Sequence, residues 1–481
     1  MLESYDLIVL GGGRAANLAI PAAKAGMKTL LIERDLLGGV CPNRGCVPSK
    51  LLIGFAEAAR HVRDAGRHFI DADFRNIDAR RIFESVNRYV GEVDGRYQGR
   101  VDDAGAELVR GEGSFIGLKT IAAAGREFAA ERIVVATGSR PAPPPFGHLP
   151  VWTSDNLFPL EGDVPKSLLV IGGGFIGCEM AAFFSAIGTE TQLFTRGDKL
   201  LGREDHDIER VFQAEFEKHV PTHCHSSLKD LSWDGAEFTA TFEIHGEAKT
   251  FTAERVLFAI GRIPNTDRLD LVKTGLASDK RGFLPVNEHL ETSVPGIFAT
   301  GDVNGRFMLQ HAAAFEVHYL RQKFLKGITY PIDERLIAHA VFSHPEVASV
   351  GFTEEQLIST GTPYVSVFED WLASARAEGM RIDYPRIKLL VSPVDHSILG
   401  CHLVGPESST LLHQVMMLMR LKNDVRELAN MIYIHPALNE CLLSAAVKAV
   451  GEIKRFDSHS KQTPASASRI TPRLDEGKSP A

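Results

Sequence analysis

Two closely spaced cysteines near the N-terminus are the residues of this chain best suited to redox chemistry. Cys41 and Cys46 stand in the stretch GGVCPNRGCVPSK. In a regular α-helix, Cα atoms five positions apart lie roughly 8 Å apart with side chains pointing in different directions, too far for a disulfide. Pro42, Gly45 and Pro48 predict a distorted backbone that brings the thiols together. A bridge over such a turn is readily reduced, which suits a catalytic pair.

The alternatives for this pair are a metal site and two buried thiols. A metal site needs further Cys or His residues at ligand spacing, and the next histidine in the sequence is His61. We therefore expect no metal here. Arg44 lies between the cysteines, where a cation favours the thiolate.

The segment IHPALNE, near the other end of the chain, holds a candidate acid–base residue. Thiol–disulfide exchange needs a thiolate and a proton for the leaving thiol, so His435 is a suitable partner. Glu440, five residues later, can fix the imidazole tautomer. From these residues alone, a histidine at the start of a helix is more often structural than catalytic.

Two segments share the order strand, glycine cluster, helix, strand. The first, residues 6–33, has Gly11, Gly13 and Ala16 in a G-x-G-x-x-A arrangement and ends in Glu33. The first glycine allows a tight turn, the second lets the backbone approach a pyrophosphate, and the third small residue lets helix and strand pack. The helix N-terminus then faces the phosphates, and the acid binds ribose hydroxyls. This segment predicts a dinucleotide site.

The second segment, residues 167–195, repeats the fingerprint with a different end. Its glycines are Gly172, Gly174 and Gly177. Its last strand ends in Thr195, where the first segment has an acid. The basic residues that follow are Arg196, Lys199 and Arg203. A missing acid beside a guanidinium predicts a 2′-phosphate, which favours NADPH and leaves NADH possible; the alternative is that these are solvated loop charges.

Composition limits the class of protein. The chain has 481 residues, of which 44% are hydrophobic and 24% charged, as in a globular protein of several domains. The net charge of -8 argues against nucleic acid as a partner. We find no apolar run of about 18 residues and no basic N-terminal leader, so we expect no membrane span and a cytoplasmic location.

The motif G-G-x-C-x-N-x-G-C-x-P-S-K resembles the signature of the class I pyridine nucleotide–disulfide oxidoreductases. This class includes dihydrolipoamide dehydrogenase, glutathione reductase, mercuric reductase and mycothione reductase. The resemblance covers about residues 1–455. It implies an α/β fold of the glutathione-reductase type, with two Rossmann-type dinucleotide-binding domains and a C-terminal α+β dimerisation domain. It also implies a homodimer with one tightly bound FAD per subunit.

The resemblance also gives expected domain boundaries. The FAD-binding domain is expected at residues 1–148 and, as a second part, at 264–336. The NAD(P)-binding domain is expected at 149–263 and the dimerisation domain at 337–455. Residues 456–481 are rich in Ser, Pro, Lys and Thr, and we expect a disordered tail there.

The class motif assigns roles to residues at the redox site. It implies that Cys41 attacks the substrate disulfide and that Cys46 contacts the flavin. It implies that Lys50 and Glu179 lie near the flavin ring. The class carries His-Pro-Thr-x-x-Glu where this chain has HPALNE, and it implies that His435 and Glu440 serve the site of the other subunit.

Further positions complete the expected site. The sequence ATGD places Asp302 in a second FAD motif, where the acid binds the ribityl chain in this class. The remaining expected nucleotide-binding residues are Arg34, Gly39, Gly138 and Gly261. His311 matches a class position beside the flavin, but it suits the core equally well. Val40, Pro42, Arg44 and Ala437 depart from the commoner class residues and leave both cysteines intact.

The substrate is less well defined by the sequence. There is no C-terminal cysteine pair beyond Cys441, which argues against mercuric reductase and the large thioredoxin reductases. Both redox cysteines are present, which argues against the soluble transhydrogenases. IHPALNE, FTRGDKLL and LQHAA are most similar to mycothione reductase, so we expect an NADPH-linked reductase of a small disulfide or dithiol compound. The alternatives are a dihydrolipoamide dehydrogenase, which uses NAD and a lipoyl-domain protein, and a redox-sensing flavoprotein of low turnover.

Overall fold

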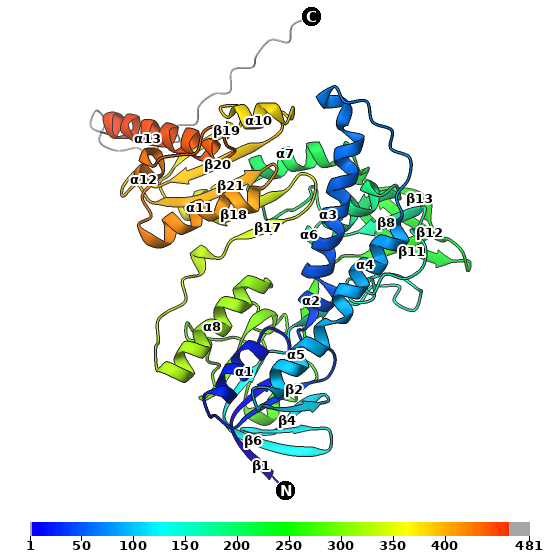
Figure 1. The fold of residues 1–481 in the computed structure, drawn as a ribbon, viewed down its shortest axis with the longest axis vertical. Coiled ribbons are helices and arrows are strands. Elements are labelled where there is room, and N and C mark those ends of the chain that lie inside the picture. The colour runs from blue at the N-terminus through cyan, green and yellow to red at the C-terminus, as the bar shows by residue number, and fades with distance from the viewer. Residues whose placement is uncertain (1, 461–481) are drawn as a thin grey trace, which may run out of the picture. The chain divides into compact units, whose positions relative to one another are not determined.

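The structure is a computed structural model of the chain and describes residues 2–460. It divides into two compact units (Figure 1). Unit 1 comprises Met1–Val62, Asp73–Asp198 and Val220–Asp333, and unit 2 comprises Arg63–Ala72, Lys199–His219 and Glu334–Ala481. The expected boundaries of the FAD-binding, NAD(P)-binding and dimerisation domains stay a prediction.

The main sheet of unit 1 has seven strands. Six of them follow the order β3-β2-β1-β6-β5-β4. The seventh, β16, pairs in parallel with residues 133–135 at the C-terminal end of β6. The strands are β1 (Leu2–Leu10), β2 (Thr29–Glu33), β3 (Glu107–Arg110), β4 (Gly113–Gly117), β5 (Thr120–Ala123), β6 (Arg126–Val135) and β16 (Ile297–Ala299). Residues Leu7 to Leu10 of β1 are all buried, because a central parallel strand is covered on both faces. Helix α1 (Ala16–Lys24) connects β1 to β2, as the first fingerprint predicts.

A second parallel sheet in unit 1 repeats this design. Its order is β10-β9-β8-β14. The strands are β8 (Ser167–Ile171), β9 (Glu190–Phe194), β10 (Thr222–His223) and β14 (Arg255–Phe258), and α6 (Phe175–Ala186) joins β8 to β9. An antiparallel meander of β11 (Ser226–Trp233), β12 (Phe238–Ile244) and β13 (Glu247–Ala253) accompanies it, and β7 (Ser139–Pro141) pairs with β15 (Arg262–Pro264).

The remaining helices that begin in unit 1 include those that carry the cysteines. They are α2 (Val40–Arg44), α3 (Cys46–Arg63), α4 (Ala79–Gly91), α5 (Val93–Asp102) and α8 (Gln310–Lys326), with short 3-10 turns η2 (Leu271–Thr274) and η3 (Gly301–Asn304). Strand β6 ends at Val135, β14 at Phe258 and β16 at Ala299, and a glycine follows each strand within three residues, at Gly138, Gly261 and Gly301.

Unit 2 is built on a five-stranded antiparallel sheet of order β17-β18-β21-β20-β19. The strands are β17 (His339–Val341), β18 (Val347–Gly351), β19 (Val365–Asp370), β20 (Arg386–Val391) and β21 (Ile398–Val404). The helices and 3-10 turns of the unit are η1 (Ala65–His68), α7 (His206–Phe216), η4 (Glu334–Leu336), α9 (Glu354–Thr360), α10 (Ala375–Gly379), α11 (Ser408–Leu421), α12 (Val425–Asn430) and α13 (Glu440–Ser460).

The two faces of this sheet differ in chemistry because side chains alternate along a strand. Ile387 and Leu389 lie in an apolar core with residues of α11, α12 and α13. Between them, Lys388 is turned the other way. Its ammonium group, in a side chain only 1% exposed, binds carboxylates at the start of α7 and α9. These are Asp205 (2.8 Å), Asp207 (2.6 Å) and Glu354 (2.6 Å).

The C-terminal boundary differs from the expectation. Helix α13 continues to Ser460, so residues 456–460 are helical and do not belong to a tail. The rest of the predicted tail, 461–481, lies outside the described residues.

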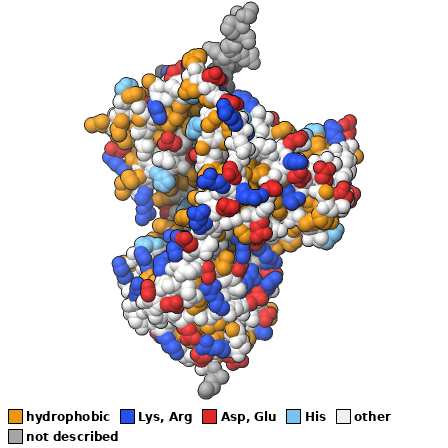
Figure 2. Space-filling view, turned by 45° about the vertical axis from the view of Figure 1, so that its right-hand side comes forward, with side chains coloured by type: hydrophobic (Ala, Val, Ile, Leu, Met, Phe, Trp, Pro, Cys, Tyr) orange, Lys and Arg blue, Asp and Glu red, His pale blue; other side chains and the backbone are white. Residues whose placement is uncertain are grey.

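Acidic and basic side chains are interspersed over the face shown in Figure 2. Among the described residues, no helix combines the length and apolar character that a membrane crossing needs.

Candidate active site

One cavity of unit 1 collects most of the residues expected to bind FAD. The predicted positions that line it are Gly11, Gly13, Glu33, Arg34, Gly39, Cys41, Cys46, Lys50, Gly138, Glu179 and Asp302. They come from the C-terminal ends of β1, β2, β6 and β16 or the residues next to them, and from the helices α2, α3 and α6. Ala16 is fully buried at the start of α1, consistent with its predicted role in helix packing.

Gly11 and Gly39 allow three backbone segments to come close together. Gly11 has φ +113°, and a Cβ there would lie 2.3 Å from the carbonyl oxygen of Ala136. Gly39 has φ +71°, and a Cβ there would lie 2.8 Å from the Cα of Gly13. No side chain fits at either position, so the turn after β1 can pack directly against the start of the redox loop.

Glu33 organises the end of β2. Its carboxylate accepts hydrogen bonds from the amides of Gly12 (2.6 Å) and Asp35 (2.7 Å). Each oxygen keeps a second lone pair for a ribose hydroxyl. Arg34 is ion-paired with Glu112 at 3.2 Å at the edge of the cavity.

The redox loop is two helices with a break between them. Helix α2 ends at Arg44 and α3 begins at Cys46, so Gly45 alone interrupts the helical path. The sequence prediction of a distorted turn is confirmed for Gly45, but it is wrong for Pro42 and Pro48. Each proline is the third residue of its helix, where no intrahelical partner for the missing N–H exists, so neither distorts the chain.

The two thiols are hydrogen-bonded and differ in acidity. The hydrogen bond from the Cys41 thiol lowers the pKa of Cys46 to about 7, with the nearby charge of Lys50 acting in the same direction. The same hydrogen bond raises the pKa of Cys41, and burial adds to that rise. In the dithiol form, the negative charge therefore resides on Cys46.

Lys50, and not Arg44, is the cation whose charge lowers the pKa of Cys46. The Lys50 ammonium donates to both carboxylate oxygens of Glu179, at 2.8 and 2.7 Å, which fixes it beside the thiols. The guanidinium of Arg44 binds Asp35 in a bidentate pair at 2.6 and 3.2 Å. The expectation that Arg44 favours the thiolate is therefore wrong, because its charge is paired with a carboxylate.

The second expected FAD motif meets the cavity at the end of β16. Asp302 accepts a hydrogen bond from the Ser139 hydroxyl at 2.5 Å. Ser139 also binds Arg262, whose side chain is only 10% exposed. The motif's backbone is held by Glu316 of α8, which accepts from the Gly301 amide at 2.6 Å. Burial raises the pKa of Glu316.

The second fingerprint builds a separate turn at the end of β8. A Cβ on Gly177 would lie 1.9 Å from the carbonyl oxygen of Gly172, so α6 packs against the turn with no room for a methyl group. Gly174 is the N-cap of α6. Gly261 has φ +114° after β14.

The basic residues after β9 have different surroundings. Thr195 follows the last residue of β9, and Arg196 is exposed, with no hydrogen bond or ion pair to any of the described residues. Lys199 pairs with Glu209 at 3.9 Å within unit 2, so the charge of Lys199 is partly neutralised. Arg203 is exposed and belongs to unit 2 as well. Of the three cations, only Arg196 belongs to unit 1 with the second fingerprint.

The candidate acid–base pair lies in unit 2. The Nδ1 atom of His435 is 2.7 Å from a carboxylate oxygen of Glu440, and the other oxygen accepts from the Ala437 amide at 2.9 Å. The hydrogen bond from His435 lowers the pKa of Glu440. The His435 side chain is 76% exposed, so its other nitrogen faces outward. His311, at the start of α8, is exposed and is not a core residue.

Comparison with known proteins places this site in a family. The model of the pyridine nucleotide-disulphide oxidoreductases matches residues 5–316, and that of their dimerisation domain matches residues 337–446. The chain belongs to this family. It is an FAD-dependent pyridine nucleotide–disulfide oxidoreductase with the glutathione-reductase-like fold that the sequence predicts, and its dimerisation domain is consistent with a homodimer.

Its relatives agree with this assignment. The dihydrolipoyl dehydrogenase of Geobacillus stearothermophilus is 32% identical over 94% of this chain and 97% of its own length. That of Bacillus subtilis is 31% identical over 93% of this chain and 96% of its own. The HOCl-induced flavoprotein disulfide reductase RclA from Escherichia coli superposes with a TM-score of 0.82 at 26% identity, covering 92% and 99% of the two chains. LpdA from Mycobacterium tuberculosis, at 24% identity and a TM-score of 0.82, shares the fold.

The cavity fits the FAD of this family. Its glycine turns leave room for a pyrophosphate, and the carboxylates of Glu33 and Asp302 line it with oxygens that can accept hydrogen bonds from hydroxyl groups. Glu316 and Ser139 were not predicted from the sequence, because neither lies in a recognisable motif. Asn43 was not predicted either, although it stands within the cysteine motif. It braces the redox loop by donating to the carbonyls of Leu37 and Gly39 at 2.9 and 2.8 Å.

Proposed function

We propose that this oxidoreductase uses NADPH to reduce the disulfide of a small thiol compound, in the manner of mycothione reductase, through FAD and the Cys41–Cys46 pair. The observation that carries the nucleotide choice is Arg196. It is exposed two residues after the end of β9, next to Thr195, which stands where NAD-binding units present an acid. A guanidinium there binds a 2′-phosphate through charge-assisted hydrogen bonds, whereas a carboxylate repels it.

The difference in acidity between the thiols assigns their roles in this proposal. Cys46 holds the thiolate, with Lys50 as its cation, and suits contact with the flavin. Bound FAD supplies the two-electron relay between the nicotinamide and the cysteine disulfide. Because the pKa of Cys41 is raised, its attack on a substrate needs a base, and we assign that role to His435 of the partner subunit.

The reduced cysteine pair passes its electrons to the substrate by thiol–disulfide exchange. Cys41 loses its proton to the imidazole, and its sulfur attacks one substrate sulfur to form a mixed disulfide. The departing thiol takes the proton back from the imidazole. The Cys46 thiolate then attacks the Cys41 sulfur, closes the cysteine disulfide and releases the second substrate thiolate, which takes a proton from solvent. Glu440 holds the imidazole tautomer throughout.

The nucleotide choice is tested by steady-state kinetics with NADPH and NADH. One guanidinium–phosphate interaction contributes about 1.5–3 kcal/mol, which corresponds to roughly a ten- to hundredfold preference. Arg196→Met should raise the Michaelis constant for NADPH by about that factor and leave NADH nearly unchanged. Lys249→Met, which removes an exposed charge from β13, is the matched control and should change neither. Equal effects of Arg196→Met on both nucleotides would refute the assignment.

The substrate is tested with mycothiol disulfide, glutathione disulfide and lipoamide under saturating NADPH. The proposal expects a small thiol disulfide to give a higher kcat/KM than lipoamide. A substantially higher value for lipoamide would overturn the substrate assignment without affecting the nucleotide assignment.

Dihydrolipoamide dehydrogenase is the second candidate. It is favoured by the names of the relatives from Geobacillus stearothermophilus and Bacillus subtilis and by Gly177, the residue more usual in NAD-linked members. This alternative predicts faster oxidation of dihydrolipoamide by NAD than any reduction with NADPH, and a lipoyl-domain protein as the natural partner. A neutral Arg196→Met variant in an NADH-preferring enzyme would favour it.

A further inference from the structure

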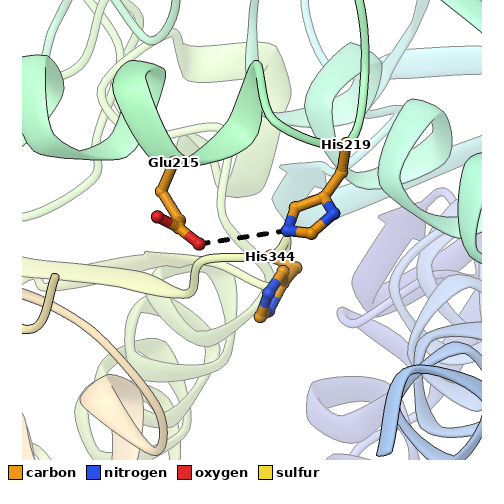
Figure 3. Close-up of side chains that lie close together, drawn as sticks. All are labelled: Glu215, His219 and His344. Carbon is orange, nitrogen blue, oxygen red and sulfur yellow. Dashed lines mark ion pairs between the residues drawn. The ribbon is translucent and has the colours of Figure 1, made fainter. Parts of the chain in front are cut away.

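Unit 2 contains one carboxylate and two imidazoles that face a common point (Figure 3). Glu215 lies in the last turn of α7, His219 follows the end of that helix, and His344 lies between β17 and β18. One ligand atom from each residue lies within 4.8 Å of the others. None of the three lines the cavity that holds the cysteines.

The fold brings the three residues together from separate segments. Glu215 and His219 are four positions apart, which puts them on the same side of the chain as α7 ends. The fully buried Phe212 and Phe216 anchor this end of the helix. The ring of His344 lies 5.1 Å from that of His219, measured between centroids.

The donor set is that of a transition-metal site. Imidazole nitrogen and carboxylate oxygen bind Zn²⁺ at about 2.0–2.2 Å, which puts two ligand atoms of a tetrahedral site about 3.4 Å apart. The Nε2 atom of His219 is 3.9 Å from the Oε1 atom of Glu215. Closing the set around an ion therefore needs side-chain movements of an ångström or so. His219 and His344 are half-buried.

The two oxygens of Glu215 have different neighbours. The Lys218 ammonium binds Oε2 at 2.5 Å, whereas Oε1 is the oxygen that faces His219. Glu215 is 3% exposed, so its position is fixed by burial as well as by this ion pair. Oε1 is therefore presented to an ion, while the Lys218 charge weakens cation binding through repulsion.

An ion-pair cluster is the competing explanation. Lys218 by itself neutralises the Glu215 carboxylate, so such a cluster does not need two imidazoles within 4.8 Å of it. The convergence of two imidazole nitrogens and one carboxylate oxygen, which are all zinc ligands, is better accounted for by a metal ion. Three protein ligands also leave a fourth position to water.

We propose that Glu215, His219 and His344 form a binding site for a divalent transition-metal ion of the zinc type. The ion ties the end of α7 to the β17–β18 connection within unit 2. The expectation of no metal came from the residues around the cysteines; this cluster is not recognisable in the sequence, because His344 is far from Glu215 and His219.

Isothermal titration of Zn²⁺ into the FAD-loaded enzyme tests the site. The enzyme is kept oxidised so that Cys41 and Cys46 are joined and offer no thiolate. We expect one ion per chain, and His219→Gln or His344→Gln should each weaken binding about tenfold or more, as loss of a direct ligand costs at least as much as loss of a supporting residue. His413→Gln removes an exposed histidine of α11 and is the matched control.

Two further measurements separate a metal site from an ion-pair cluster. Lys218→Met should tighten Zn²⁺ binding, because it removes the opposing charge and keeps all three ligands. Zn²⁺ should raise the melting temperature of the wild type and of His413→Gln, but not that of His219→Gln. FAD content and melting without metal show whether each variant is folded.

The proposal fails if wild-type enzyme does not bind Zn²⁺, or if all histidine variants bind it equally. It also fails if His219→Gln weakens binding while folded His344→Gln does not, since the site would then lack its third ligand. Weaker binding by Lys218→Met would likewise contradict it.

Discussion

Replacing Lys50 by methionine tests how the chain stabilises a thiolate. The pKa of Cys46 lies at about 7, against an ordinary value of 9.0. At pH 7 about half of this thiol is therefore ionised, compared with about one in a hundred for an ordinary cysteine. The hydrogen bond from Cys41 is the main cause, and the Lys50 charge adds to it.

Two effects of Lys50→Met act in the same direction. The variant removes the favourable charge, and it leaves the Glu179 carboxylate, only 4% exposed, without its 2.7 Å partner. That carboxylate opposes ionisation of Cys46. An opposite charge nearby typically moves a pKa by about 1–3 units, so the thiolate fraction at pH 7 should fall at least about fivefold.

The assay is a pH titration of the long-wavelength absorbance that the thiolate produces against the flavin in reduced enzyme. In the wild type, the band should fade as pH falls through about 7, because protonation removes the thiolate. Lys50→Met should move the midpoint to higher pH, and Lys50→Arg should leave it nearly in place. Adding Glu179→Gln to Lys50→Met should bring the midpoint part of the way back. An unchanged or lower midpoint in Lys50→Met would show that the Lys50 charge does not stabilise the Cys46 thiolate.

Three further predictions concern stability, assembly and cofactor binding. Lys388→Met should destabilise unit 2 by about 3–5 kcal/mol in thermal melts, because it leaves buried carboxylates without their cation; a loss below about 1 kcal/mol would contradict this. Mixed dimers of inactive Cys41→Ala and inactive His435→Ala chains should recover activity through one intact composite site, whereas silent verified hybrids would place His435 outside the chemistry. Gly39→Ala should lower FAD content in purified protein, since its methyl group meets backbone at 2.8 Å, while Gly26→Ala, with similar positive φ and open space, should retain FAD.

The sequence predicted those parts of the site that depend on local backbone chemistry. Gly11 and Gly39 were recognisable because the turns they form need a missing Cβ, and the strand ends follow directly from apolar runs. The cysteine loop was predicted as distorted, but the cause was divided among three residues when only Gly45 interrupts the helices. Prolines are informative only once the helix start is known, since the first turn tolerates them.

The sequence could not show how charges pair. Arg44 seemed placed to act on the thiols by its position between them, yet it binds Asp35, whose approach depends on how β2 and α2 meet. The Lys388 cluster joins α7, α9 and β20, and each of its charges looks like an ordinary surface residue in the sequence. Pairings over such distances are set by tertiary packing, which one sequence does not reveal.

Anaerobic titration of the FAD-loaded enzyme with NADPH tests whether electrons pass to the Cys41–Cys46 pair. About one equivalent of NADPH should produce the long-wavelength thiolate band in the wild type. Cys41→Ser should show that band without any reductant, because Cys46 is left as a free thiolate, and Cys46→Ser should never show it. A band in Cys46→Ser that is missing from Cys41→Ser would contradict the assignment of the two cysteines.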